Sequence, residues 1–211
     1  MKFLVFTDLH QNTDQIDWLN SVIEDNDAEF AVCLGDVTDF GTGEEAAEIL
    51  SSIKTKVYAI PGNCDPLDFP QKISDVAVDM HGKSAEIDGL KFVGLGGSNI
   101  TIFNTAFELE EDALYDGLKK NACKGMVLMT HAPSYGILDQ IPSGASVGSP
   151  AIKKIVDEYR PILAMSGHIH EAIGVECIEG TTFVNPGPAK EGHCAIVEID
   201  GGAVAVQLHK A

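Results

Sequence analysis

Short apolar runs recur along the chain, and several are followed at once by Asp, Asn or His. The run from Phe30 to Leu34 ends in Gly35-Asp36. A run this short, rich in small and β-branched residues, predicts a buried strand rather than a helix. Four further runs end in the same way, over residues 2–7, 57–61, 126–130 and 162–166. We therefore expect five buried strands, each with a polar side chain at its carboxyl end.

The segments between the first runs carry the periodicity of amphipathic helices. Apolar residues from Ile16 to Ile23 recur at helical spacing, and Thr13 is the expected N-cap of this helix. Three more helices are expected over residues 44–53, 110–121 and 150–159. Alternation of strand and helix predicts right-handed crossovers and parallel strands in the first part of the chain.

The middle and the end of the chain have the pattern of hairpins instead. Asp88-Gly89 separates two short runs, and this dipeptide is a strong hairpin indicator. Short strands are expected over residues 76–78, 83–87, 90–94, 173–178, 181–184, 195–199 and 203–208. The combined pattern predicts an α/β fold of two mixed sheets packed face to face, with helices outside, as a single domain over residues 1–211.

Composition narrows the classes of partner. The chain has 211 residues, of which 45% are hydrophobic, and a formal net charge of −18. This charge argues against extended nucleic acid and anionic membranes, and a phosphate-bearing substrate would need a locally positive cleft. No apolar run approaches the ~18 residues of a membrane-spanning helix, and the five cysteines form no C-x-x-C pair. We expect a cytoplasmic protein with reduced thiols and no membrane contact.

The polar residues after the five runs form one candidate site. If those strands lie side by side and parallel, their carboxyl edges gather seven side chains: Asp8, His10, Asp36, Asn63, His131, His168 and His170. Seven N and O ligands exceed what one tetrahedral zinc ion needs, and they suit two metal ions bridged by Asp36. Taken alone, Asp36 is better explained as a cap of the next turn or helix, and any one histidine fits a hydrogen-bonded structural role. The repetition at five strand ends favours the metal site.

The order of these motifs resembles a known family. D-x-H, G-D-x-x-D, G-N-[HC]-D, an isolated histidine and G-H-x-H follow one another as in the calcineurin-like metallophosphoesterases. Residues 94–99, 131–133, 147–149 and 184–187 add a similarity to small prokaryotic phosphoesterases related to the cyclic-AMP phosphodiesterase type. The resemblance runs from Lys2 to Pro188 and implies a four-layer α-β-β-α sandwich.

The family pattern implies a division of the seven ligands between two ions. One ion is expected on Asp8, His10, Asp36 and His170, and the other on Asp36, Asn63, His131 and His168. A mixed set of N and O ligands fits Mn²⁺ or Fe best, and Zn²⁺, Ni²⁺ or Co²⁺ are also compatible with it.

The resemblance further implies a phosphoesterase, and more specifically a phosphodiesterase. A hydroxide bridging the two ions would attack phosphorus in line, with Asp36, Asn63, Cys64 and His131 as the catalytic residues. The expected partner is a small phosphate ester, and nucleotides are among the candidates. The resemblance to small family members also implies that the chain can form a homo-oligomer. The alternative is a scaffold that keeps the fold and binds a partner protein with little or no turnover. Loss of ligands would favour that alternative, whereas all seven are present here.

Cys64 is the informative departure, because many family members carry histidine at this position. A thiol with a pKa near ~8.5 donates a proton to a leaving alkoxide less readily than imidazolium does. Cysteine also occurs here in family branches with diesterase activity, which favours a diesterase. A small buried residue that fills the turn is an equally good interpretation of Cys64.

The remaining polar residues are less informative. Asp39 and Asp65 fit either carboxylates that orient the ligands or solvated turn residues. His81 and His193 have no assigned role, and His209 is expected in a surface strand near the C-terminus. The long loop over 132–149 and residues 99–105 are expected to shape the substrate site.

Overall fold

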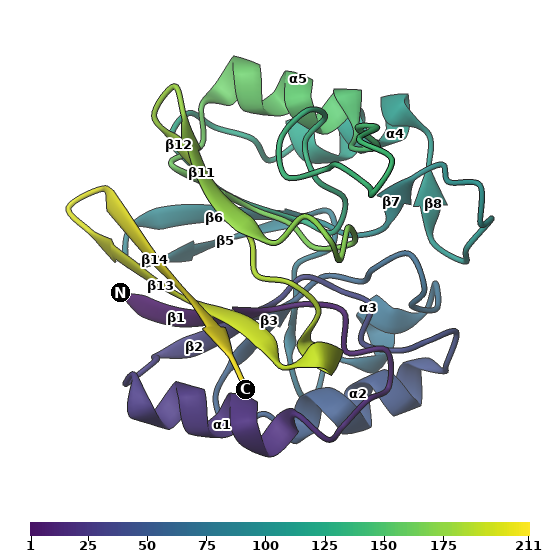
Figure 1. Ribbon diagram of the computed structural model, residues 1–211, viewed down its shortest axis with the longest axis vertical. Coiled ribbons are helices and arrows are strands. Elements are labelled where there is room, and N and C mark those ends of the chain that lie inside the picture. The colour runs from purple at the N-terminus through teal and green to yellow at the C-terminus, as the bar shows by residue number, and fades with distance from the viewer.

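Two six-stranded sheets packed face to face form the centre of the molecule, and helices cover both outer surfaces (Figure 1). The structure is a computed structural model and describes residues 1–211. The outer helices are α1 (Ile16–Asp25) and α2 (Gly43–Ser51) on one side, and α4 (Glu111–Lys119) and α5 (Pro150–Tyr159) on the other. The predicted α/β sandwich of two mixed sheets with helices outside is confirmed.

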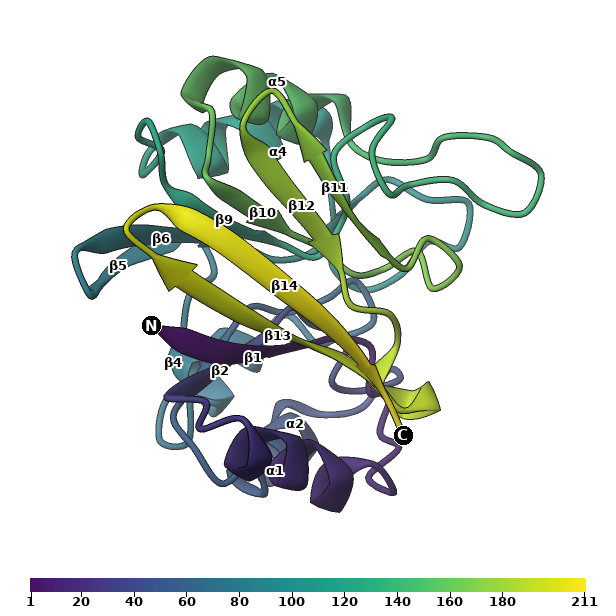
Figure 2. The same cartoon turned by 60° about the vertical axis from the view of Figure 1, so that its left-hand side comes forward.

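The first sheet has the strand order β14-β13-β1-β2-β3-β4. Its strands are β1 (Lys2–Phe6), β2 (Phe30–Cys33), β3 (Val57–Ala59), β4 (Val78–Asp79), β13 (His193–Asp200) and β14 (Ala203–Lys210). β1 to β4 are parallel, because each helical crossover returns the chain to the same end of the sheet. β13 and β14 form an antiparallel hairpin that extends this sheet beside β1 (yellow in Figure 2).

The second sheet has the strand order β11-β12-β10-β9-β6-β5. Its strands are β5 (Lys83–Ile87), β6 (Leu90–Leu95), β9 (Val127–Thr130), β10 (Leu163–Met165), β11 (Gly174–Ile178) and β12 (Thr181–Asn185). The four central strands are parallel, and an antiparallel hairpin closes each edge. Asp88 and Gly89 both have positive φ in the turn between β5 and β6, as the predicted two-residue hairpin requires.

The strand expected over residues 76–78 is present but begins later, so that only the assignment of residues 76 and 77 is wrong. The chain first forms a short helix that the sequence pattern did not predict, α3 (Phe69–Lys72), and the N–H groups of Val76 and Ala77 then both donate to the carbonyl of Ile73. These hydrogen bonds keep residues 76 and 77 in the turn that ends the helix. The strand β4 therefore begins only at Val78.

The N-cap predicted for the first helix is also wrong. Gln15 occupies the N-cap position of α1, without a side-chain cap, because a turn in which Ile16 N–H donates to the Thr13 carbonyl precedes the helix. The second helix is capped by Thr42, which forms a reciprocal capping box with Glu45. This box starts α2 at residue 43, and the helix ends at 51 rather than at 53.

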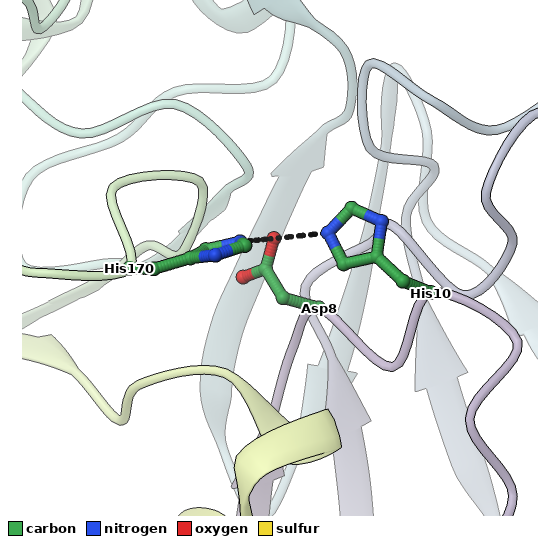
Figure 3. A group of neighbouring side chains, drawn as sticks. All are labelled: Asp8, His10 and His170. Atoms are coloured by element: carbon green, nitrogen blue, oxygen red, sulfur yellow. Dashed lines mark hydrogen bonds and ion pairs between the residues drawn. The ribbon is translucent and has the colours of Figure 1, made fainter.

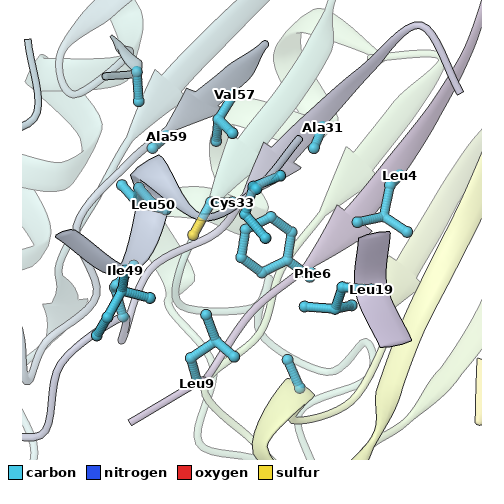
Figure 4. Packing of buried hydrophobic residues seen from close by; sticks show 14 of the residues in the cluster. Leu4, Phe6, Leu9, Leu19, Ala31, Cys33, Ile49, Leu50, Val57 and Ala59 are labelled. Atoms are coloured by element: carbon cyan, nitrogen blue, oxygen red, sulfur yellow. The ribbon is translucent and has the colours of Figure 1, made fainter. Parts of the chain in front are cut away.

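Three hydrophobic cores separate the four layers, and the two-residue period of each strand divides its side chains between them. In β1, Leu4 and Phe6 pack against α1 and α2, in the core shown in Figure 4. Phe3 and Val5 point the other way and pack between the sheets with residues of β6, β9 and β10. A third core joins the second sheet to α4 and α5. Truncation of a fully buried side chain such as Phe6 to Ala would cost about 3–5 kcal/mol.

The five strands with polar ends are divided between the two sheets, which corrects the expectation that they lie side by side. β1, β2 and β3 belong to the first sheet, and β9 and β10 belong to the second. The carboxyl ends of these strands meet at the same end of the sandwich, as the contacts of Asp36 with His131 and of Asp8 with His170 show. Three short elements were not predicted. They are the paired strands β7 (Ser98–Asn99) and β8 (Glu108–Leu109) and the single-turn helix η1 (Ala189–Glu191). None of the helices is both long and apolar enough to cross a membrane.

Candidate metal centre

Asp8 lies between two histidines from distant parts of the chain. Its Oδ1 is 3.2 Å from Nε2 of His170 and 3.7 Å from Nε2 of His10, and the two rings flank the carboxylate from opposite sides (Figure 3). Asp8 and His10 follow β1, whereas His170 follows β10 in the other sheet. The ligand atoms of all three residues lie within 4.8 Å of one another, so that this group could hold a metal ion.

Asp36 stands between His10 and His131. Its Oδ2 lies 3.6 Å from Nε2 of His10 and 3.5 Å from Nε2 of His131. The other oxygen, Oδ1, accepts a 2.8 Å hydrogen bond from the backbone N–H of Cys64. One carboxylate oxygen is thus held by the backbone, while the other faces histidines of both expected ligand sets.

His131 is fully buried, and its two ring nitrogens have different surroundings. Nδ1 lies 2.8 Å from the carbonyl oxygen of Leu34, which can only accept, so Nδ1 carries a proton. Nε2 lies 2.9 Å from Oδ1 of Asn63 and faces Asp36. With the proton fixed on Nδ1, the lone pair of a neutral His131 ring points from Nε2 toward Asn63 and Asp36, which suits a metal ligand.

His168 lies beside this group and is held through its backbone. Its ring meets the His131 ring edge to face, with centroids 5.0 Å apart, and its backbone N–H donates to Oδ2 of Asp8 over 3.1 Å. The imidazole of His168 is not part of the acidic and histidine groups with ligand atoms within 4.8 Å of one another. The structure therefore brings all seven predicted side chains into one connected cluster, with His168 at its margin.

The spacing of these atoms fits divalent ions. Nε2 of His10 is buried and has no hydrogen-bond partner, although it faces both Asp8 and Asp36. Two ligands about 2.1 Å from one ion, at tetrahedral or octahedral angles, lie about 3.0–3.5 Å apart. The nitrogen–oxygen separations of 3.2–3.7 Å around Asp8 and Asp36 are close to this range, and only the shortest, between His170 and Asp8, is within hydrogen-bond distance. An ion would give the orphaned His10 nitrogen the partner that it lacks.

The backbone is strained where it presents these side chains. Asp8, His10, Asp36 and His168 all have φ between 46° and 66°, in the left-handed region that most residues avoid. The N–H of Asp8 donates to the Gly35 carbonyl and that of His10 donates to the Asp36 carbonyl, both over 2.9 Å. These hydrogen bonds tie the loop after β1 to the loop after β2. Strain that is fixed by surrounding hydrogen bonds is concentrated at functional sites in proteins.

The charges in the cluster stabilise one another. Burial opposes ionisation of Asp8, but its interactions with His10 and His170 hold its pKa well below the usual range. Burial likewise opposes ionisation of Asp36, yet the neighbouring His131 lowers its pKa. Burial disfavours the protonated His131 ring as well, but attraction to Asp36 prevails and raises the pKa of His131 to about 9. Both carboxylates are therefore ionised at neutral pH, and His131 is cationic when no ion is bound.

The pKa values of His10 and His168 shift in opposite directions. Burial opposes protonation of His10, but interaction with Asp8 and attraction to Asp36 raise its pKa. Burial and the neighbouring His131 together lower the pKa of His168 to about 4. His168 is consequently neutral at physiological pH, as a metal ligand must be.

Cys64 is buried within this cluster. Its thiol sulfur lies 3.6 Å from Nδ2 of Asn63 and within 4.8 Å of ligand atoms of His10 and Asp36. Burial, followed by the negative charge of Asp36, raises the pKa of the Cys64 thiol far above its usual value. With no ion bound, the group is a neutral thiol that contacts the site, and both sequence-based interpretations of Cys64 remain compatible with this placement.

Asp65 is buried and connects the site loops through hydrogen bonds, so it is not a solvated turn residue. Its carboxylate accepts hydrogen bonds from the backbone N–H groups of Val37, Thr38 and Gly62, and from the hydroxyl of Thr38. These bonds join the loop that carries Asp36 to the loop that carries Asn63. Burial and the charge of Asp36 raise the pKa of Asp65 to about 6. By contrast, the side chain of Asp39 is 59% exposed, and its Oδ1 lies 3.7 Å from Nδ1 of His10.

The other histidines lie apart from the cluster. Nδ1 of His81 accepts a hydrogen bond from the N–H of Gly96, and its ring packs edge to face on Phe107. His193 lies in β13 and His209 lies in β14, where they form part of the terminal hairpin. The expected position of His209 in a strand near the C-terminus is confirmed.

Glu108 was missed from the sequence, and Thr105 was included only within the 99–105 segment expected to shape the substrate site, without its contact to Asn63. The hydroxyl of Thr105 accepts a 3.0 Å hydrogen bond from Nδ2 of Asn63 and in turn donates to Glu108. The T-x-x-E spacing of the two residues is the capping-box pattern and could have indicated their mutual contact. Nothing local in the sequence links them to Asn63, which lies 42 residues before Thr105.

Comparisons with known proteins identify the family of the chain and the fold that it shares with solved structures. A family model described as calcineurin-like phosphoesterase matches residues 1–172. The uncharacterized protein MJ1162 of Methanocaldococcus jannaschii is 35% identical over 199 residues, which cover 89% of this chain and 88% of that protein. Among solved structures, an archaeal phosphodiesterase aligns with a TM-score of 0.61 at 15% identity, over 99% of this chain and 100% of that one. A dimetal phosphatase from Danio rerio aligns with a TM-score of 0.66 at 12% identity, over 100% and 96%. The chain belongs to the calcineurin-like phosphoesterase family.

Proposed function

We propose that the protein is a phosphodiesterase that depends on two divalent metal ions. The observation that carries this proposal is the position of Asp36 Oδ2, which lies 3.6 Å from His10 Nε2 and 3.5 Å from His131 Nε2. A carboxylate between two histidines of separate ligand sets suits a bridge between two ions. One ion would use Asp8, His10, Asp36 and His170, and the other would use Asp36, Asn63, His131 and His168.

The ligand set favours Mn²⁺ or Fe, with Zn²⁺, Ni²⁺ or Co²⁺ as alternatives, because nitrogen and hard oxygen donors are mixed. Bound ions would supply Lewis-acid activation of a water molecule for in-line attack on phosphorus and would neutralise phosphate charge. The chain itself holds the donors in place. Leu34 fixes the proton of His131 on Nδ1, and the N–H of Cys64 holds one oxygen of Asp36 so that the other faces the site.

A preference for diesters is supported by Cys64. Imidazolium at this position could protonate a leaving alkoxide, whereas a buried neutral thiol beside the negative charge of Asp36 is a weak acid. Substrates with a stabilised leaving group depend less on such an acid. One of the structural neighbours is an archaeal phosphodiesterase, although a likeness at 15% identity extends to the fold alone.

The substrate is proposed to be a small phosphate ester, because the groove that begins next to His170 has no basic side chain. The loop after β9 lines a groove of about 440 Å³ together with residues 171–176, which directly follow His170. Side chains that line this groove include Asp139, Glu171 and Glu176, and none of the lining residues is basic. A long polyanion such as nucleic acid would be repelled here and by the net charge of −18.

The test is turnover of p-nitrophenyl phosphate and bis-p-nitrophenyl phosphate by protein loaded with Mn²⁺, with Asp36→Asn as the control. The proposal predicts hydrolysis of both esters, a higher kcat/KM for the diester, and loss of both activities in the control. A protein that binds two ions yet hydrolyses neither ester would favour the alternative, a scaffold that binds a partner protein. A monoester preference would contradict the diesterase assignment.

A further inference from the structure

The loop between β7 and β8 is held by a single carboxylate. Glu108 accepts hydrogen bonds from the backbone N–H of Thr101 over 3.2 Å and from its hydroxyl over 2.6 Å. It also accepts from the backbone N–H of Thr105 over 2.9 Å and from its hydroxyl over 2.7 Å. Burial opposes ionisation of Glu108, but these hydrogen bonds lower its pKa to about 2. At neutral pH Glu108 is thus a carboxylate that only accepts.

This carboxylate fixes the direction of the next hydrogen bond. Because Glu108 cannot donate, the single proton of the Thr105 hydroxyl points at Glu108. The lone pairs of that hydroxyl oxygen are then free to accept, and Nδ2 of Asn63 lies 3.0 Å away. The NH₂ end of the Asn63 amide is therefore directed toward Thr105.

The amide oxygen of Asn63 is directed into the cluster as a consequence. With Nδ2 on Thr105, Oδ1 lies 2.9 Å from Nε2 of His131. The flipped amide would place its oxygen against a hydroxyl whose proton is already used by Glu108, and would turn two N–H groups toward the site. Backbone hydrogen bonds keep the loop at this distance, since Phe107 N–H donates to the Asn63 carbonyl over 3.0 Å.

We infer that Glu108 is a positioning residue of the candidate metal centre, which acts through Thr105 to turn the amide oxygen of Asn63 toward the ion. The inference rests on the proposed function, in which Asn63 is a ligand of the second ion. A metal ion needs the oxygen of an amide and is repelled by its NH₂ group, so the orientation of Asn63 controls the affinity of that site. Mutation of a residue that hydrogen-bonds to a metal ligand typically lowers the metal affinity by about 10- to 100-fold.

Two pairs of variants separate the hydrogen-bond relay from simple packing. Thr105→Val keeps the shape of the side chain and loses the hydroxyl, whereas Thr105→Ser keeps the hydroxyl. Glu108→Ala removes the acceptor, whereas Glu108→Gln retains an amide oxygen that can accept from Thr105. Glu110→Ala is the charge control, because Glu110 lies nearby at the start of α4 and its side chain forms no cap hydrogen bond.

The measurement is calorimetric titration of chelator-treated protein with Mn²⁺. We expect two sites in the unmodified chain, and one of the two should bind about 10- to 100-fold more weakly in Thr105→Val and Glu108→Ala. Thr105→Ser, Glu108→Gln and Glu110→Ala should stay within about threefold of the unmodified protein. Fewer than two sites in the unmodified protein would contradict the proposed function. Two sites there, with unchanged affinities in Thr105→Val, would overturn the relay itself.

A second readout needs no variant and no metal. In NMR spectra of the metal-free protein, the side-chain NH₂ of Asn63 should exchange slowly with water, because one of its protons is held by Thr105. A rapidly exchanging Asn63 side-chain amide would overturn the inference even if the loop variants failed to fold.

Discussion

Gly62 lies so close to Asp36 that a Cβ atom at position 62 would sit 2.0 Å from Oδ1 of Asp36 and 2.2 Å from its backbone nitrogen. The approach is mutual, since a Cβ at Gly35, which has a φ of +101°, would lie 2.2 Å from the nitrogen of Gly62. The loops after β2 and β3 therefore touch backbone to backbone. The carboxylate proposed to bridge two ions is positioned by this contact.

Gly62→Ala is expected to displace Asp36 and to lower kcat/KM for bis-p-nitrophenyl phosphate by about 100-fold, the effect of a displacement near 1 Å in a catalytic group. Gly117→Ala in α4 is the matched control, because its Cβ would meet only side-chain atoms of Leu95, at 3.1 Å. That variant should keep activity within about twofold. Unchanged activity in Gly62→Ala would show that the position of Asp36 does not matter for turnover.

Asp36→Asn and His131→Ala are each expected to lower turnover by more than about 100-fold, beyond the usual cost of a change outside the ligands. Both chains should remain folded. In Asp36→Asn the amide oxygen can still accept from Cys64 N–H, and neither Asp36 nor His131 belongs to any of the three hydrophobic cores. Circular dichroism checks the fold, and activity is measured after loading with Mn²⁺. His209→Ala, in the terminal hairpin, serves as the control. Activity at the unmodified level in either ligand variant would exclude the proposed site.

Cys64→His is expected to raise the ratio of monoesterase to diesterase activity by up to ~10²-fold, the lower end of what a positioned acid contributes. Hydrolysis of a monoester with a poor leaving group gains most from a proton donor. The stabilised leaving group of an aryl diester departs without one. Cys64→Ala should leave diester hydrolysis largely intact, because the thiol is not the nucleophile in this account. The test is kcat/KM for both ester types in the three proteins with saturating Mn²⁺. Loss of diester hydrolysis in Cys64→Ala, with both ions still bound, would assign the thiol a direct role.

The fold class and the members of the cluster could be predicted from the sequence, because both depend on local patterns of residues. Each strand is a short apolar run, and the residue that follows it stands at the carboxyl edge whichever sheet the strand joins. For this reason Asp36 and His131 could be predicted as neighbours although they come from different sheets. The division of the five strands between two sheets does not alter which side chains meet.

Contacts that depend on tertiary structure could not be predicted in this way. The pairing of Asn63 with Thr105 and that of His131 with the Leu34 carbonyl span 42 and 97 residues. A backbone carbonyl also has no sequence signature. Competing local interactions explain the errors in secondary structure: the turn after α3 kept Val76 out of β4, and a turn at Thr13 displaced the start of α1.

The metal-free protein is expected to lose stability as the pH rises. The pKa of His131 is raised to about 9 in the folded chain, above the value near ~6.5 of an unfolded chain. Its contribution to the free energy of unfolding is therefore fully present below pH ~6.5 and is lost as the pH rises through about 9. Urea unfolding of chelator-treated protein at pH 6.5, 8 and 9 measures this change, and His131→Gln should remove it. Parallel pH curves for the two proteins would refute the charge assignment of His131.

Asp36 is proposed to bridge two ions held by the ends of five strands. Anomalous scattering from crystals grown with Mn²⁺ tests this proposal most directly, because it counts and locates the ions independently of activity. The account predicts two peaks about 3.5 Å apart. One peak should lie among Asp8, His10, Asp36 and His170, and the other among Asp36, Asn63, His131 and His168. A single peak, or two peaks coordinated by other residues, would contradict the account.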